Sequence, residues 1–342
     1  MYSFKNDYTE GAHPRILQAL IESNFDQEEG YGRDRFTLKA ISLLKEKMAN
    51  PNVDIHLVSG GTQTNLTAIS AFLRPHEAVI ATTAGHVFTH ETGAIEATGH
   101  KVISVETEDG KLNPAKIIEV LNSHTDEHMV KPKLVYISNT TEIGSIYNKR
   151  ELTDLKAFCE EYNLFLYMDG ARLGSALCSV DNDLQLSDIP ALVDAFYIGG
   201  TKNGALLGEA LVITRNSLKE DFRFHLKQKG ALLAKGRLLG IQFYELFRDD
   251  LFLDLAKHAN KMANILSEGC RNAGFSFLID SPSNQLFPIF PDTLIAELQK
   301  SYSFYVWEQI DATNSAVRLV TSWATKEEEV RAFVEEINRV GK

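Results

Sequence analysis

The sequence predicts an α/β protein, with a mostly parallel central sheet flanked by helices and a smaller α+β domain after it. Up to about residue 250, short apolar runs alternate with amphipathic stretches, a pattern typical of parallel strands joined by helices. Beyond that point, strand-like runs crowd between short helices. We therefore expect a large domain over residues 1–250 and a small domain over residues 251–342, with the N-terminal segment packed on the small domain.

In the large domain, apolar runs predict strands and amphipathic runs predict helices. The first strand, Val53–Val58, leads into a helix over Thr62–Leu73. Another helix opens at Asn113-Pro114, which suit the N-cap and first helical positions, and a third covers Glu151–Tyr162. The remaining strands are expected at Ala78–Ala81, Val102–Val105, Leu134–Ser138, Leu164–Met168, Ala195–Ile198 and Ala210–Thr214.

The small domain opens with a long predicted helix, Asp254–Asn272, which ends before Gly274. A shorter helix is expected at Asp292–Lys300, and apolar residues at helical spacing predict a last helix near the C-terminus. The strands are expected at Phe275–Ile279, Gln285–Phe290, Phe304–Ile310 and Val317–Ser322.

Composition is that of an ordinary globular protein, with 44% hydrophobic and 24% charged residues. A formal net charge of -11 without a basic block argues against nucleic acid or an anionic membrane as partner. No apolar run approaches membrane-span length, and the N-terminus lacks the apolar region of a signal peptide. The cysteines indicate reduced thiols and a cytoplasmic protein, a catalytic cysteine being the less favoured alternative: Cys159, Cys178 and Cys270.

A candidate anion-binding loop follows the first strand, in the segment Ser59–Asn65. Gly60 and Gly61 let the backbone approach a ligand, and the helix that begins there offers free N–H groups and a positive dipole end. The Thr62 hydroxyl adds a donor. A tight turn with Thr62 as N-cap explains the segment equally well.

A lysine and an aspartate form the most informative pair in the chain. Asp169 closes the run Leu164–Met168, and Lys202 follows 33 residues later, at the end of the next strand. Both would point into one cleft at the carboxyl ends of the strands. A lysine there can form a Schiff base, and an aspartate can keep a pyridine nitrogen protonated, the two demands of pyridoxal phosphate (PLP). A helix N-cap for Asp169 and a surface turn for Lys202 are the ordinary alternatives.

His86 is a candidate for stacking on such a ring or for proton transfer, because imidazole titrates near neutrality. His90 lies four residues on, at the spacing of a metal-binding pair. The segment does not match HExxH and suggests no third ligand, so we expect no metal and only a structural role for His90.

Two arginines are candidates for binding a carboxylate, because a guanidinium group can donate two parallel hydrogen bonds to it. Arg172 lies three residues after Asp169, and Arg318 lies in the run Val317–Ser322. A surface position for Arg172 and a cross-strand pair for Arg318 are the ordinary alternatives.

The order of these residues, with their local sequences, resembles the threonine aldolase family of PLP-dependent enzymes of fold type I over nearly the whole chain. The DGAR segment, with a lysine at this distance, is fairly specific, and the phosphate loop alone is not. The matching segments are Tyr31-Gly32-x-Asp34, Gly61–Asn65, His86 with Glu91, and Asp169-Gly170-Ala171-Arg172.

The resemblance implies roles for single residues. Lys202 would carry PLP as a Schiff base, Asp169 would pair with the pyridinium nitrogen, and His86 would stack on the ring. The expected phosphate ligands are Gly61, Thr62 and Thr201. The expected substrate ligands are Arg172 and Arg318, Asn6 where the family has a serine, and Tyr31, which would approach an active site, its own or a neighbouring subunit's.

The reaction implied by the resemblance is retro-aldol cleavage of an L-β-hydroxy-α-amino acid. L-Threonine or L-allo-threonine would give glycine and acetaldehyde. A homo-oligomer is also implied, with a dimer as the active unit and a tetramer as the expected assembly.

The chain departs from the family pattern at two positions. Thr141 stands where many members have a second active-site histidine, so removal of the β-hydroxyl proton would fall to His86, water or another group. In Lys227-Gln228-Lys229-Gly230, a lysine, Lys227, replaces the arginine of the family's RQAG segment that serves the phosphate region. The alternatives are an aldolase for a bulkier substrate such as phenylserine, a β-eliminating lyase, an aminotransferase, and a PLP-binding protein without turnover.

Overall fold

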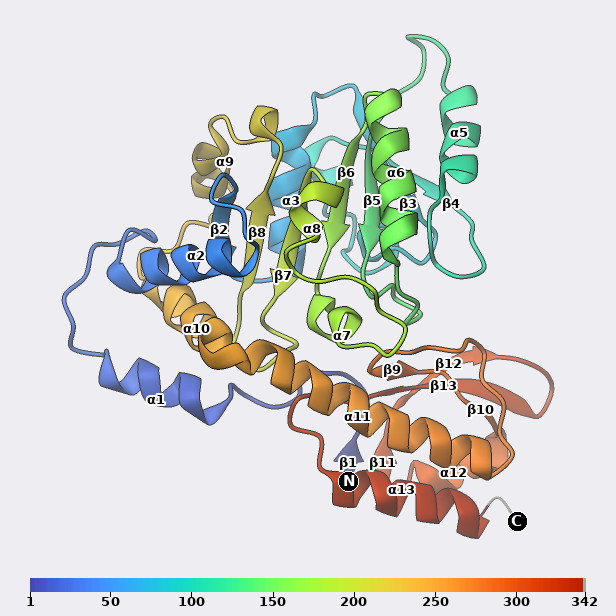
Figure 1. The fold of residues 1–342 in the computed structure, drawn as a ribbon. Helices are drawn as coiled ribbons and strands as arrows, with labels where there is room; N and C mark the ends of the chain where they lie inside the picture. Colours follow the sequence, from blue (N-terminus) through green and yellow to red (C-terminus); the bar gives the residue numbers. More distant parts are fainter. Residues whose placement is uncertain (341–342) are drawn as a thin grey trace.

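The computed structural model describes residues 1–340, and a seven-stranded sheet in the order β2-β8-β7-β6-β5-β3-β4 forms its centre (Figure 1). β8 runs antiparallel to both of its neighbours, and the other four pairings are parallel. The predicted, mostly parallel sheet is therefore confirmed. Its strands are β2 (Asp54–Val58), β3 (Glu77–Thr82), β4 (Val102–Val105), β5 (Lys131–Ser138), β6 (Phe165–Asp169), β7 (Ala195–Gly199) and β8 (Glu209–Ile213).

The sheet separates two apolar cores, because successive residues of each central strand point to opposite faces. In β5, Val135 and Ile137 belong to one core and Leu134 and Tyr136 to the other. Burial on both faces explains why these strands read as continuous apolar runs in the sequence. Helices cover the faces: α3 (Gly61–Phe72), α5 (Pro114–Asn122), α6 (Lys149–Glu161), α7 (Leu173–Leu177), α8 (Ile189–Leu192) and α9 (Phe222–Gln228), with the short α4 (His86–Thr89) after β3.

Three helices that the periodicity did not single out support one edge of the sheet: α1 (Pro14–Glu22), α2 (Arg35–Lys47) and α10 (Arg237–Phe247). α2 and α10 pack closely together, and Gly240 makes that approach possible. A Cβ atom on Gly240 would lie 2.5 Å from the backbone nitrogen of Thr37. The sequences of α1 and α2 are amphipathic, so the signal for these helices was present along the chain.

A second, antiparallel sheet lies at the other end of α11 (Leu251–Asn272), which packs beside α7 and α13 (Glu327–Val340) (Figure 1). Its strands are β9 (Gln285–Leu286), β10 (Ile289–Pro291), β12 (Tyr305–Gln309) and β13 (Asn314–Val320), with α12 (Asp292–Leu298) beside β10. β1 (Tyr2–Ser3) pairs in parallel with β11 (Tyr302–Ser303), and Phe4 is buried in the same apolar cluster. The N-terminus therefore packs on the C-terminal part of the chain, and the boundary at residue 250 stays a proposal.

The predicted strand Phe275–Ile279 is wrong, since it is reduced to a single bridge between Phe277 and Pro288. Proline has no N–H to donate, so a ladder opposite Pro288 cannot continue. The predicted strand Gln285–Phe290 is divided into β9 and β10 for the same reason.

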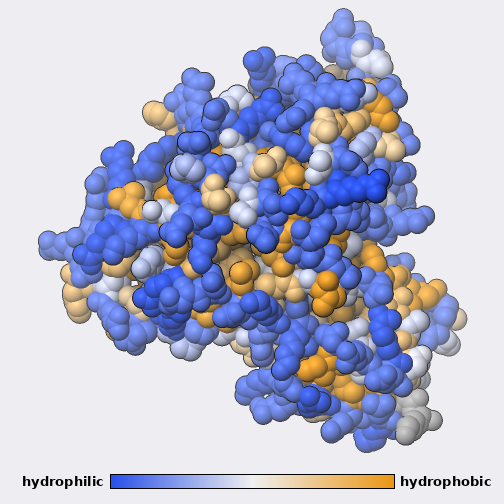
Figure 2. Space-filling view, in the orientation of Figure 1, coloured by the Kyte–Doolittle hydropathy of each residue, from blue (hydrophilic) through white to orange (hydrophobic). Residues whose placement is uncertain are grey.

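The surface shown in Figure 2 is mostly hydrophilic, with hydrophobic residues scattered between the polar ones. None of the helices within residues 1–340 combines the length and apolar character that crossing a bilayer requires. The three cysteines are free thiols, as predicted. Burial raises the pKa of Cys159 and Cys270 to about 12 and that of Cys178 to about 11, so none supplies a thiolate near neutral pH.

Candidate active site

A cavity of about 330 Å³ opens at the carboxyl ends of β5, β6 and β7. Open α/β sheets bind their ligands at this edge, because the parallel strands end there and loops supply side chains. The predicted site residues in its wall are Gly61, Thr62, His86, Asp169, Arg172, Thr201 and Lys202. The other lining residues are Tyr8, Ser59, Gly60, Ser138, Thr140, Glu142, Ala171, Tyr197 and Glu209.

Two glycines bring the ends of β6 and β7 close enough for Asp169 and Lys202 to share this cavity. A Cβ atom on Gly170 would lie 1.9 Å from the carbonyl oxygen of Tyr197, and one on Gly199 would lie 2.3 Å from that of Ala171. Any side chain at either position would push the strand ends apart. The glycines of both motifs are therefore packing requirements as well as features of turns.

Asp169 is buried and held by hydrogen bonds that favour its ionised form. Oδ1 accepts from the backbone N–H of Ala171 at 2.9 Å. Oδ2 accepts from the Tyr136 hydroxyl at 2.6 Å and from Asn65 Nδ2 at 3.2 Å. Burial raises the pKa of Asp169, but the charge of His86 and these hydrogen bonds outweigh it and hold that pKa below its ordinary value. A carboxylate is therefore present at neutral pH.

Lys202 is partly buried in the same cavity. Burial, and after it the charge of Arg172, lowers the pKa of its ammonium group, while Asp7, Asp169 and Glu209 act in the opposite direction. A lowered pKa increases the share of free amine, which is the nucleophilic form.

The N-terminus of α3 faces the cavity without a side chain to cap it. The N-cap is Gly60, with extended backbone, so the alternative in which Thr62 caps the helix is wrong. Nothing lies within 4 Å of the place where a Gly60 side chain would begin. The first N–H groups of a twelve-residue helix are thus left to bind an anion such as a phosphate.

Thr201 lies in the wall, but its hydroxyl already has partners. Its Oγ1 accepts from the Gly208 N–H at 3.0 Å and donates to Glu209 at 2.9 Å. Burial raises the pKa of Glu209 to about 8. Glu209 thus fixes the orientation of the Thr201 hydroxyl at the edge of the cavity.

His86 is oriented by an acid, Glu91, which lies five residues further along the chain. Its Nδ1 lies 2.8 Å from Glu91 Oε1, which also accepts from Asn65 Nδ2 at 2.7 Å. Asn65 thus connects the imidazole partner with Asp169. The ring of His90 lies 5.6 Å from that of His86, and no group of three metal-binding side chains occurs among residues 1–340.

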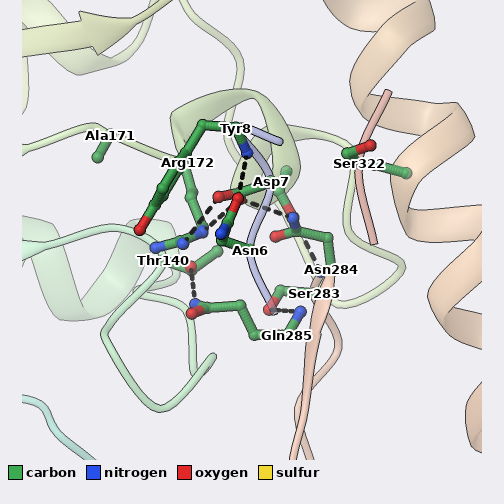
Figure 3. Close-up of polar contacts among 12 residues, drawn as sticks. Asn6, Asp7, Tyr8, Thr140, Ala171, Arg172, Ser283, Asn284, Gln285 and Ser322 are labelled. Atoms are coloured by element: carbon green, nitrogen blue, oxygen red, sulfur yellow. Dashed lines mark hydrogen bonds and ion pairs between the residues drawn. The ribbon is translucent and has the colours of Figure 1, made fainter. Parts of the chain in front are cut away.

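Arg172 lines the cavity and forms a buried ion pair with Asp7 (Figure 3). Its Nε and Nη2 donate to the two Asp7 oxygens at 2.7 and 3.0 Å. Asn284 Nδ2 donates to Asp7 Oδ2 at 3.0 Å. The surface alternative for Arg172 is therefore wrong.

Arg318 lies behind the cavity wall rather than in it. Its Nη2 donates to Gln285 Oε1, and Gln285 Nε2 donates to the wall residue Thr140 at 3.2 Å. Its Nε is buried without a hydrogen-bond partner. Burial, and then the charge of Arg172, lowers the pKa of Arg318 to about 10, so it remains a cation.

The last two predicted site residues do not line the cavity of this chain. Asn6 lies beside Asp7, and its Oδ1 accepts from Tyr8 N and Thr9 Oγ1 at 3.0 and 2.9 Å (Figure 3). Tyr31 is 44% exposed and lies against Lys227, whose Nζ is 4.4 Å from the ring centroid. Tyr31 precedes α2 and lines a separate small pocket beside α10.

Several residues of the site were not predicted from the sequence, among them Asp7, Tyr136, Glu142 and Glu209. Glu209 had a recognisable signal, since it is an acid at the start of an apolar strand. Asp7, in contrast, reaches Arg172 across 165 positions of sequence. Only the folded chain shows such a pair.

We expect Asp7→Ala to lower the free energy of unfolding by about 3–5 kcal/mol, because it leaves the Arg172 charge buried without its partner. The control Asp254→Ala, from an exposed pair with Lys257, should cost less than about 1 kcal/mol. Denaturant unfolding at pH 7 measures both.

The Asp7 effect should depend on pH. Burial raises the pKa of Asp7, but Arg172 and Lys202 outweigh it and hold that pKa below its ordinary value. Such a group stabilises the fold above its unfolded pKa, and this contribution is lost as pH falls through the folded pKa. The difference in the free energy of unfolding between wild type and Asp7→Ala should become smaller below about pH 4. If this difference stayed constant with pH, the charge of Asp7 would not be its cause.

The fold and the cavity define a class of α/β proteins with a buried aspartate, a cavity lysine and a helix N-terminus for an anion. The chain belongs to the beta-eliminating lyase family, whose model matches residues 4–327. A low specificity L-threonine aldolase of Pseudomonas aeruginosa is 32% identical over 98% of this chain and 97% of its own length.

Solved structures agree with this placement. A threonine aldolase of Leishmania major is 53% identical, with 100% of both chains covered and a TM-score of 0.99. An aspartate aminotransferase of Thermus thermophilus is 15% identical, covers 99% of this chain and 91% of its own, and has a TM-score of 0.74, which shows the shared fold alone. The predicted fold class is confirmed.

Proposed function

We propose that this protein is a PLP-dependent aldolase that cleaves L-threonine, L-allo-threonine and related L-β-hydroxy-α-amino acids to glycine and an aldehyde. The observation that carries the proposal is that Lys202, Asp169 and Arg172 line one cavity below the uncapped N-terminus of α3. The L-threonine aldolases among its relatives support this substrate class over elimination or amino transfer.

The residues of the cavity fit PLP at each of its functional groups. The free N–H groups of Gly61 and Thr62 suit the phosphate, and the ionised Asp169 suits a protonated pyridine nitrogen. Lys202 would hold the aldehyde carbon, and His86 would lie against the ring. When bound, PLP supplies an electron sink for the electron pair of the broken Cα–Cβ bond.

The arginines would bind the carboxylate of the amino acid. Arg172 has Nε and Nη2 engaged by Asp7, and its Nη1 has no hydrogen bond within the described residues. Nη1 would donate to the substrate, while Asp7 holds the guanidinium plane in place. Arg318 would add charge from behind the wall, and Asn6, the neighbour of Asp7 in the sequence, would assist from the N-terminal segment.

We expect Arg318→Ala to raise KM by about 10-fold with a smaller change in kcat, because it removes a buried cation that would attract the substrate carboxylate from behind the wall. Initial rates over a range of threonine concentrations measure this. The control Arg150→Ala removes an arginine whose side chain is 90% exposed on α6 and should leave KM unchanged. Unaltered saturation in Arg318→Ala would assign that arginine a purely structural role.

The proposed reaction is tested by incubating the PLP-loaded protein separately with L-threonine, L-allo-threonine and their D-isomers. We expect acetaldehyde from the L-isomers. Ammonia with a keto acid would indicate a β-eliminating lyase, and keto-acid-dependent amino transfer would indicate an aminotransferase. Cleavage of phenylserine alone would move the preference to bulkier substrates, and a protein that stays colourless with PLP would contradict cofactor binding.

The remaining parts of the proposal concern assembly and location. The protein would be a cytoplasmic homo-oligomer. A dimer as its active unit would explain why Tyr31 lies away from the cavity of its own chain. Analytical ultracentrifugation measures the assembly, and a monomer that is fully active would contradict it.

A further inference from the structure

Three carboxyl groups line the cavity, and they differ in how many of their oxygens are already bonded. Both oxygens of Asp169 accept hydrogen bonds, as do both oxygens of Glu209. Glu142 uses only Oε1, which accepts from the backbone N–H of His86 at 2.9 Å and from the Ser138 hydroxyl at 2.8 Å. Its Oε2 makes no hydrogen bond with another of the described residues, and Glu142 lines the cavity.

Glu142 stands between the two ends of the site. It is held on one side by His86 and the end of β5, where the ring of the cofactor would lie. Its negative charge also reaches Arg172 and Arg318, the two groups expected to bind the substrate carboxylate, although burial lowers the pKa of Arg318 to about 10. A substituent on Cβ of a bound amino acid occupies the space between these ends.

The neighbouring candidates are engaged elsewhere. Thr141, at the position of the second histidine, is buried, does not line the cavity and shares its hydroxyl with Ser145 at 2.8 Å. His86 has Nδ1 on Glu91 and is placed to lie on the ring. Glu142 Oε2 and His86 Nε2 are therefore the acceptors left for a substrate, and stacking on the cofactor would occupy the ring of His86.

We propose that Glu142 is the catalytic base that takes the proton from the β-hydroxyl group of the substrate. This inference rests on the proposed aldol cleavage. The O–H bond breaks and its proton passes to Oε2; the electron pair left on oxygen forms the C=O bond of the aldehyde. The Cα–Cβ bond breaks and leaves its electron pair on Cα, which takes up one proton to complete glycine, while Glu142 releases its proton to solvent.

The groups that face Glu142 determine when it can act. They are His86 from α4, Tyr136 and Ser138 from β5, Asp169 from β6, and the nearby Arg172 and Arg318. Burial, and then the charge of Asp169, raises the pKa of Glu142 above its ordinary value. Because the base must be ionised, cleavage should increase with pH through this raised pKa and fall on its acid side.

The test compares Glu142→Gln and Glu142→Asp with the PLP-loaded wild type in two reactions. One is aldehyde release from L-allo-threonine across pH 5–9; the other is exchange of the glycine α-proton in D2O, which involves no β-hydroxyl. We expect Glu142→Gln to lose about 10²- to 10⁴-fold in kcat for cleavage, and to lose the acid limb, while exchange stays within about threefold of wild type. Glu142→Asp keeps a carboxyl group and should keep the acid limb at an intermediate rate.

The matched control is Thr141→Val, the adjacent residue outside the cavity, for which we expect wild-type rates in both reactions. Cleavage by Glu142→Gln near the wild-type rate would overturn the inference, and so would an equal loss of cleavage and exchange in both Glu142 variants. Wild type that exchanges glycine but releases no aldehyde would instead overturn the proposed function, and the role of Glu142 with it.

Discussion

Lys202→Ala should release no measurable aldehyde, a loss of at least about 10⁴-fold, and should lack the visible absorption of protein-bound PLP. Alanine has no amine to bond the cofactor. The fold should survive, because burial is the largest influence on the pKa of Lys202 and lowers it, so the variant loses a charge that its surroundings disfavour. Absorption spectra after incubation with PLP and a fixed-time aldehyde assay measure the two effects.

The control for this variant is Lys257→Ala, which removes a lysine whose side chain is 62% exposed on α11. It should keep both the spectrum and the activity of wild type. An unchanged spectrum and undiminished aldehyde release in Lys202→Ala would show that Lys202 is not the residue that binds PLP.

Asp169→Asn is expected to lower kcat by about 10²- to 10³-fold with little change in shape, since the amide has the size of the carboxylate but no charge. An uncharged partner cannot hold the proton on the pyridine nitrogen. The loss should affect aldehyde release and glycine α-proton exchange alike, which distinguishes it from the effect of Glu142→Gln. Single-turnover rates for both reactions measure it.

Tyr136→Phe is the companion to Asp169→Asn. It removes the 2.6 Å hydrogen bond to Oδ2 and keeps the charge. We expect a smaller loss than for Asp169→Asn, since Asn65 and Ala171 still hold the carboxylate. If kcat fell equally in the two variants, the Tyr136 hydroxyl rather than the charge of Asp169 would determine the rate.

Part of the site was predictable from local sequence because its residues follow strand ends. Asp169 and Lys202 close β6 and β7, and Gly61 opens α3 directly after β2. In an open α/β sheet these positions meet at one edge, so spacing alone brings them together. The small domain was harder, since short strands such as β9 and β10 depend on their partners rather than on their own pattern.

The sequence by itself determined the central sheet, the helix α3 whose N-terminus would bind the phosphate, and the pair Asp169 and Lys202. These features follow from the spacing of apolar residues, from glycines and from the ends of strands, all of which are local properties of the chain. Only the tertiary structure decided which charges share the cavity. Asp7 reaches Arg172 from the N-terminus, Glu209 meets Thr201 across β7 and β8, and Glu142 turns inward where Thr141 turns away. The physical reason is that ion pairs and free acceptors depend on distance in space and on burial, and neither is encoded in the spacing of residues along the chain.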